Sequence, residues 1–242
     1  MKNYAIRRVR LGLILLAALG LVAVLRPYCT QETAPVFTRM PDQVLILDPG
    51  HGGEDGGAVS VSGQKESDLN LAIALRLDRL MGFYGVQTLL TREDDRSIHD
   101  PSAGTIREKK VSDIHNRVAL VNGVENGTLI SIHQNSFPSH QYHGTQVFYA
   151  EEIRSRPLAQ GVQDLVRQHL DPSNTREAHR IPDTVYLMNH ISCRAILVEC
   201  GFLTNPEEDL LLQDGTYQQK LAMVLGAGYL QYGDTQEGES LI

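Results

Sequence analysis

The feature of this chain that most constrains its fold is a glycine-dense segment directly after a short apolar run. The run is Val44–Leu47, and the segment Asp48–Ala58 that follows it contains five glycines and His51. An apolar run that stops at Pro-Gly predicts a buried strand that ends in a loop. Such a loop presents the His51 imidazole with little crowding, as a metal ligand requires. A phosphate-binding loop is disfavoured, because neither G-x-x-x-x-G-K-[ST] nor G-x-G-x-x-G leads into the next helix.

Two further polar residues, His133 and Glu199, each end another apolar run, at 129–132 and 195–198. In open α/β sheets, sites assemble at the carboxyl ends of the strands. We therefore expect His51, His133 and Glu199 to meet at one edge of a sheet, with Glu66 nearby at the start of a helix. Two imidazoles and a carboxylate can hold a catalytic zinc ion with one open position, and a further carboxylate can act as acid and base.

Each of these residues also has an ordinary structural explanation. The chain has nine histidines, and a single histidine is usually a polar surface group. The other seven are assigned to that class: His99, His115, His140, His143, His169, His179 and His190. Glu66 is explained equally well as a charge that stabilises the start of a helix. Glu199 is also explained as a salt-bridging carboxylate at a strand end.

Charge and cysteine content exclude several classes of function. Asp and Glu total 29 and Lys and Arg 22, and five of these cations precede the first acidic residue, so the remaining body carries a net charge of about −12. Such a body is not expected to bind nucleic acid through bulk electrostatics. Cys29, Cys193 and Cys200 predict neither a disulfide framework nor a zinc ribbon. Because neighbouring strand residues face opposite sides, Cys200 is expected to be buried if Glu199 faces the site.

The N-terminal segment predicts export. Four basic residues precede an apolar run from Leu11 to Leu25, and no acidic residue occurs before Glu32. This pattern is typical of a signal sequence or signal anchor, and the run is short for a transmembrane span of roughly 20 residues. No clean cleavage site precedes Arg26, which favours an uncleaved or variably cleaved anchor with the body outside. The protein is therefore expected to be extracytoplasmic, either membrane-anchored or secreted.

Strands and helices alternate along the rest of the chain. Strands are expected at 44–48, 86–92, 128–133, 145–149 and 195–199. Helices are expected from Ser67-Asp68 to about 81, from Ser112-Asp113 to about 121, at 157–170 and at 217–232, with a surface loop at 171–182. This alternation predicts a single-domain α/β fold with a mostly parallel or mixed central sheet of about six strands and helices on both faces. We expect a signal sequence or anchor at 1–30, a linker at 31–42, a catalytic domain at 43–233 and a loose tail at 234–242.

Five short segments form a specific combination, although each alone is weak. They are Asp48–Ala58, Glu66, Arg117–Asn122, Ser131–Asn135 and Val198–Asn205. Together they resemble the zinc-dependent N-acetylmuramoyl-L-alanine amidases of bacterial cell-wall turnover, over about residues 43 to 232. The loop from Thr91 to Asp113, the segment Tyr186-Leu187-Met188 and the short chain are most similar to the germination-specific amidases, which act on spore-cortex peptidoglycan.

The resemblance implies a set of functional residues and a substrate. It implies His51, Glu66 and His133 as ligands of one zinc ion, Glu199 as general acid and base, and Arg117, Asn122 and Asn135 as support or substrate-binding residues. The substrate would be peptidoglycan, at the amide between N-acetylmuramic acid and the L-alanine of the stem peptide. In spore cortex this cleavage would be the first step toward muramic-δ-lactam.

Three alternatives stay open. The chain is explained also as a vegetative division or turnover autolysin of the same chemistry, as a zinc carboxypeptidase or other metallopeptidase, or as an inactive peptidoglycan-binding relative. The last would have lost a ligand or Glu199, and none is replaced. The short segment between His133 and Glu199 leaves little room for an autoinhibitory helix, which implies an open site or control by an activating protein partner. An uncleaved anchor would add an N-terminal membrane contact.

Overall fold

The computed structural model describes residues 43–233. The chain divides into two units, Met1–Thr38 and Arg39–Ile242, and the described residues all belong to the second. The expected signal segment at 1–30, the linker at 31–42 and the tail at 234–242 therefore lie outside the described residues.

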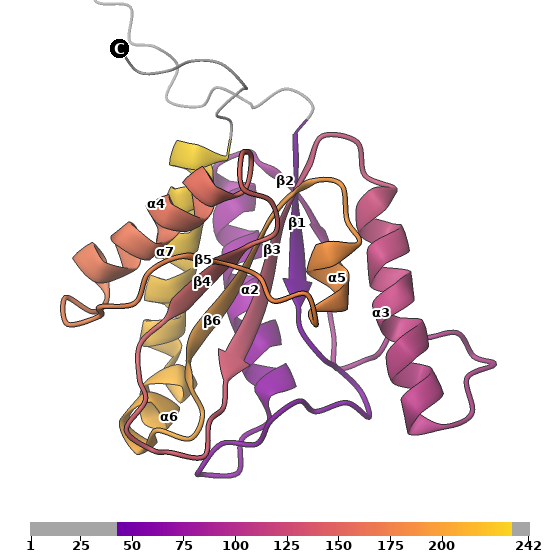
Figure 1. Cartoon of the computed structure of the whole chain (residues 1–242), viewed down its shortest axis with the longest axis horizontal. Helices are drawn as coiled ribbons and strands as arrows, with labels where there is room; N and C mark the ends of the chain where they lie inside the picture. Colours follow the sequence, from indigo (N-terminus) through magenta and orange to yellow (C-terminus); the bar gives the residue numbers. More distant parts are fainter. Residues whose placement is uncertain (1–42, 234–242) are drawn as a thin grey trace, which may run out of the picture. The chain divides into compact units, whose positions relative to one another are not determined.

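Six strands form one mixed sheet in the order β2-β1-β3-β6-β4-β5 (Figure 1). They are β1 (Val44–Pro49), β2 (Gln87–Leu90), β3 (Gly127–Asn135), β4 (Gln146–Tyr149), β5 (His179–Arg180) and β6 (Arg194–Phe202). Strands β2, β1, β3 and β6 run parallel, while β4 is antiparallel to β6 and parallel to β5. The central strands are almost wholly buried, as strands covered on both faces are. The predicted fold class is confirmed.

Six described helices cover the two faces of the sheet (Figure 1). They are α2 (Glu66–Phe83), α3 (Ile106–Asn122), α4 (Arg156–His169), α5 (Tyr186–Asn189), α6 (Pro206–Gln213) and α7 (Gly215–Tyr232). Helices α2, α4 and α7 pack together on one face, and α3 and α5 lie on the other. Within residues 43–233, no helix combines the length and apolar character needed to cross a membrane.

Side chains alternate along β6, so that one face of the strand packs in the core and the other faces a cleft. Val198 and Cys200 belong to the core beneath α2, α4 and α7, and Cys200 is fully buried. Glu199 lines a cleft on the opposite face, the face of α3 and α5. Burial raises the pKa of the Cys200 thiol, which makes it a poor nucleophile. The expectation that Cys200 is interior filler is confirmed.

The structure corrects several expected boundaries. Helix α3 begins at Ile106 and not at Ser112, because Thr105 and Glu108 form a capping box in which each side chain bonds the other's backbone amide. Helix α2 begins at Glu66 after Lys65, which makes no side-chain capping bond, so the expected cap at Ser67-Asp68 is wrong. Strand β5 occupies part of the expected loop 171–182, and helices α5 and α6 were not predicted.

Candidate metal centre

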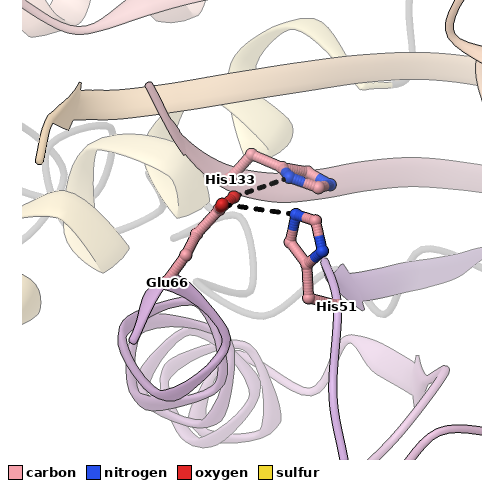
Figure 2. Close-up of side chains that lie close together, drawn as sticks. All are labelled: His51, Glu66 and His133. Carbon is pink, nitrogen blue, oxygen red and sulfur yellow. Dashed lines mark hydrogen bonds and ion pairs between the residues drawn. The ribbon is translucent and has the colours of Figure 1, made fainter. Parts of the chain in front are cut away.

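The side chains of His51, Glu66 and His133 meet at the carboxyl edge of the sheet (Figure 2). His51 lies just beyond β1, Glu66 is the first residue of α2, and His133 lies near the end of β3. One ligand atom from each residue lies within 4.8 Å of the others. Glu66 Oε1 is 2.9 Å from His133 Nδ1, and Glu66 Oε2 is 3.3 Å from His51 Nε2. The structure thus brings together the three residues that the sequence singles out as metal ligands.

The donor set and its spacing fit a zinc ion. Zinc–ligand bonds of about 2.0–2.2 Å place tetrahedral ligand atoms roughly 3.3 Å apart. Each imidazole nitrogen lies 2.9 or 3.3 Å from one of the two Glu66 oxygens, and one ligand atom from each residue lies within 4.8 Å of the other two. Catalytic zinc sites use three nitrogen or carboxylate ligands from the protein and keep a fourth position open. Across residues 43–233, this is the one group of three or more His, Cys, Asp or Glu residues arranged to hold a metal ion.

Two glycines permit this close approach. A Cβ atom at Gly50 would lie 2.1 Å from the His133 ring. A Cβ atom at Gly57 would lie 2.6 Å from Glu66 Oε2 and 2.8 Å from His51 Cδ2. Gly57 also has a φ of +69°, in the left-handed region that favours glycine. The glycine-dense loop is therefore required by the packing of the three side chains as well as by the turn.

Backbone amides fix the Glu66 carboxylate. The amide of Ala58 donates to Oε2 at 2.9 Å, and the amide of Gln134 donates to Oε1 at 3.2 Å. Burial alone would raise the pKa of Glu66, but hydrogen bonds with His133 and His51 and their charges hold it well below its usual range. The carboxylate therefore stays ionised at neutral pH, as a metal ligand must.

Asp55 orients His51, and the sequence analysis did not single it out. His51 Nδ1 lies 3.0 Å from Asp55 Oδ2, which leaves Nε2 facing Glu66. A carboxylate on the far nitrogen fixes the ring and tautomer of a metal-binding histidine. Burial alone would lower the pKa of His51, but hydrogen bonds with Asp55 and Glu66 raise it to about 9. Metal binding at His51 therefore requires loss of a proton.

Two buried arginines hold the loop that carries His51. Arg117 donates to the carbonyl oxygens of Pro49 at 3.1 Å and His51 at 2.8 Å. Arg92 donates to the carbonyl oxygens of Pro49 at 2.9 Å and Gly50 at 3.0 Å. The residues are only 2% and 1% exposed, so these carbonyl bonds replace hydration that the guanidinium groups have lost. Arg117 thus supports the site from beneath the loop, and Arg92 is a support residue that the sequence analysis did not identify.

A buried carboxylate, Asp48, balances the charge of Arg117. The two side chains are 2.5 Å apart, and Asp113 adds a second ion pair to Arg117 at 2.7 Å. The hydroxyls of Thr91 and Ser131 donate to Asp48. Burial alone would raise the pKa of Asp48, but Arg117 and these hydroxyls hold it at about 2. Because loss of one partner from a buried pair costs about 3–5 kcal/mol, this network is a structural base for the His51 loop.

Glu199 faces the same cleft from β6. It is the register partner of His133 across the parallel β3–β6 pair. Its Oε2 atom is buried and has no hydrogen-bond partner among residues 43–233. Burial, together with repulsion from Glu66, raises the pKa of Glu199 to about 7, against the opposing effect of His133 and His51. A carboxyl group with a free oxygen and a pKa near neutrality is suited to accept and return a proton.

Asn122 and Asn135 lie apart from this cluster. Asn122 ends α3, where its side chain bonds the backbone of His190 and Ser192. Asn135 ends β3, where its carbonyl oxygen accepts from the amide of Leu203. Neither residue lines the cleft that contains the metal-site residues. Their assignment as support or substrate-binding residues stays a prediction.

His51, His133 and Glu199 border a cleft of about 250 Å³. Helix α5 forms one wall with Tyr186, Leu187 and Met188, the segment noted in the sequence. Helix α3 contributes Lys110 and Ile114. The cleft therefore presents an apolar wall opposite the polar residues of the candidate metal centre.

Comparison with known proteins assigns the chain to a family. A family model described as N-acetylmuramoyl-L-alanine amidase matches residues 45–228, which include His51, Glu66, His133 and Glu199. The chain belongs to the N-acetylmuramoyl-L-alanine amidase family. The germination-specific N-acetylmuramoyl-L-alanine amidase of Bacillus subtilis (strain 168) is 37% identical over 200 residues, covering 81% of this chain and 82% of that relative.

Two solved structures of amidases also resemble this chain. The CwlD amidase of Clostridioides difficile, solved in complex with the GerS lipoprotein, matches with a TM-score of 0.77 and 36% identity, over 80% of this chain and 100% of that chain. An N-acetylmuramoyl-L-alanine amidase of Clostridium difficile 630 matches with a TM-score of 0.70 and 29% identity, over 81% and 98%. The predicted amidase family and N-acetylmuramoyl-L-alanine amidase activity are thereby confirmed.

Proposed function

We propose that this amidase is zinc-dependent and acts on spore-cortex peptidoglycan. The observation that carries the zinc assignment is the meeting of His51, Glu66 and His133 beside Glu199, whose buried oxygen has no partner among the described residues. Family membership supplies the bond that is cut, the amide between N-acetylmuramic acid and L-alanine.

The side chains of the site have separate tasks in this proposal. His51 Nε2, the Glu66 carboxylate and His133 Nδ1 would hold the zinc ion. When bound, zinc would polarise the scissile carbonyl and lower the pKa of a water molecule to about 7. Glu199 takes the proton of the attacking water and delivers it to the departing nitrogen of L-alanine. Its buried Oε2 atom, which has no hydrogen-bond partner among residues 43–233, lets one carboxyl group serve both steps.

The cortex role is supported by the most informative relatives. One is a germination-specific amidase at 37% identity, and another, at 36% identity, is an amidase solved with the GerS lipoprotein. We therefore propose that this protein is exported, anchored at the membrane or secreted to the wall or cortex, and that it works with an activating protein partner there.

Deletion of this protein in its host is expected to leave growth and division near normal, to abolish muramic-δ-lactam and to block cortex breakdown during germination. The physical reason is that muramic acid must lose its peptide before another enzyme deacetylates and cyclises it. Mass analysis of cortex fragments from deletion and complemented spores measures the lactam. Complementation with E199Q should fail to restore it. Chained vegetative cells with unchanged lactam would identify a division or turnover autolysin and refute the cortex role.

A further inference from the structure

A second hollow lies next to the catalytic cleft, on the same face of the sheet. It has a volume of about 510 Å³ and is lined by residues 141–143, 146, 174–177 and 179, from the loops and strands at the β4–β5 edge. On this face helix α5 contacts β6 and helix α3, and β4 and β5 lie beyond β6 in the strand order. The hollow therefore lies over β4 and β5, the strands beyond β6, while helix α5 forms a wall of the cleft over β6.

Strand register connects the hollow with the catalytic residue. Gln146, which lines the hollow, is the antiparallel partner of Glu199, which lines the cleft. Directly opposed residues of an antiparallel pair point to the same face of the sheet. Neighbouring strands are about 5 Å apart, so one residue from each hollow, Gln146 and Glu199, lies a single strand-to-strand step from the other. A substrate bound at Glu199 can thus extend into the hollow.

Arg176 is held in the hollow with one nitrogen unused. Its Nε donates to the carbonyl oxygen of His143 at 2.7 Å, and its Nη1 donates to Gln146 Oε1 at 2.9 Å. Its guanidinium carbon lies 4.6 Å above the centre of the Phe202 ring. The amide of Arg176 is fixed by the side chain of buried Asn174. Among residues 43–233, Nη2 has no acceptor, so this oriented guanidinium still has an N–H group to offer a ligand.

The carboxylates near Arg176 leave its Nη2 group free. Among the described residues, Arg176 is the one guanidinium or ammonium group that lines the hollow, and Glu177 is the one carboxylate. The carboxylate of Glu208 also acts electrostatically on Arg176, but its two oxygens accept the backbone amides of Gly144 and Phe202. Glu177 is exposed, and its backbone carbonyl rather than its carboxylate bonds Gln146. A guanidinium with free donors recognises a carboxylate best. In the substrate of an amidase of this family, free carboxylates belong to the stem peptide, because the muramic acid carboxyl group is used in the amide.

We propose that the Arg176 hollow is a subsite for a carboxylate of the stem peptide, on the alanine side of the bond that is cut. This inference rests on the proposed function. The distance from Glu199 to the head of Arg176 is roughly 10 Å, because it combines one strand spacing to Gln146 with the length of the glutamine side chain. An extended peptide advances about 3.3 Å per residue, so about three residues of the stem cover this distance. The subsite therefore receives the carboxylate that ends the third residue of the stem.

The test compares two disaccharide tripeptides that differ only in their C-terminal group, a carboxylate or a carboxamide. For the wild-type protein loaded with zinc, kcat/KM is expected to be roughly 10-fold higher for the carboxylate substrate, because its KM is lower. A factor of this size is what one hydrogen bond to a charged group contributes. R176Q should reduce this ratio to near one. R180Q is the matched control, because Arg180 is on β5 next to His179 and adjacent strand residues face opposite sides. R180Q should keep the wild-type ratio.

Two results would overturn the subsite. One is a wild-type ratio near one, and the other is an R176Q variant that loses activity on both substrates equally, which would make Arg176 a purely structural residue. If the wild-type protein releases no stem peptide from either substrate, the proposed function itself fails, and the subsite fails with it. Failure of the proposed function is distinguishable from failure of the subsite, because it is seen with the wild-type protein alone, before any variant is compared.

Discussion

Replacement of Glu199 by glutamine is expected to lower turnover by at least about 10²-fold, the usual loss when a general acid-base group is removed. Glutamine keeps the shape of the side chain but cannot take a proton. Because His51, Glu66 and His133 remain, bound zinc should stay at the wild-type level. Turnover of peptidoglycan fragments and metal content should be measured on the same preparation.

Glu207→Gln provides the matched control for E199Q. Glu207 is exposed in the first turn of α6 and does not line the cleft. This variant should keep both zinc and turnover. If E199Q instead loses its zinc, Glu199 is a metal ligand and the division of roles is wrong. If E199Q turns over normally, Glu199 does not move the proton.

Replacement of His133 by alanine is expected to remove bound metal and, with it, activity. The protein should carry about one zinc per chain, since the three side chains form a single site. His133 supplies one of only three protein ligands, and its loss also leaves Glu66 Oε1 without the imidazole 2.9 Å away. Metal content after dialysis, measured by elemental analysis, reports the effect directly.

His169→Ala is the control for this experiment. His169 is the exposed last residue of α4, and it is not a member of the metal cluster. It should keep zinc and activity, while a chelator should inactivate the wild-type protein and added zinc should restore it. Full zinc content in H133A would remove His133 from the ligand set.

The sequence predicted the parts of the site whose residues follow buried strands. The apolar runs that become β1, β3 and β6 are long enough to identify, and parallel strands bring their carboxyl ends to one edge. His51, His133 and Glu199 could therefore be placed at that edge. Glu66 was less secure, because a carboxylate at a helix start has an equally good electrostatic explanation.

The missed elements lack a periodic signal or are very short. The first turns of α3 expose Ile106 and Val111, so the apolar side chains there do not mark a buried stripe. The Thr105–Glu108 capping box was present in the sequence and would have located this start. Strand β5 has two residues and α5 has four, which is too little chain for a pattern.

Apart from Arg117, which the family resemblance implies, the support beneath the site could not be predicted from the sequence. Arginine is rarely buried unless it is paired, so the sequence gives no reason to place Arg92 under the His51 loop. Its burial depends on the carbonyl oxygens of Pro49 and Gly50, which point inward only once the loop has folded. Asp55 illustrates the same limit, because its bond to His51 Nδ1 depends on the left-handed backbone of His51, with φ of 62°.

The most direct test of a catalytic zinc site is the mass spectrum of peptidoglycan fragments incubated with metal-free protein and with the same protein reloaded with zinc. Only the zinc-loaded protein is expected to release an intact stem peptide with a free L-alanine amino terminus and to leave muramic acid with a free lactoyl carboxylate. Cleavage within the stem peptide would indicate a carboxypeptidase or another metallopeptidase. Equal release by the metal-free protein would contradict the assignment of His51, Glu66 and His133 as a catalytic zinc site.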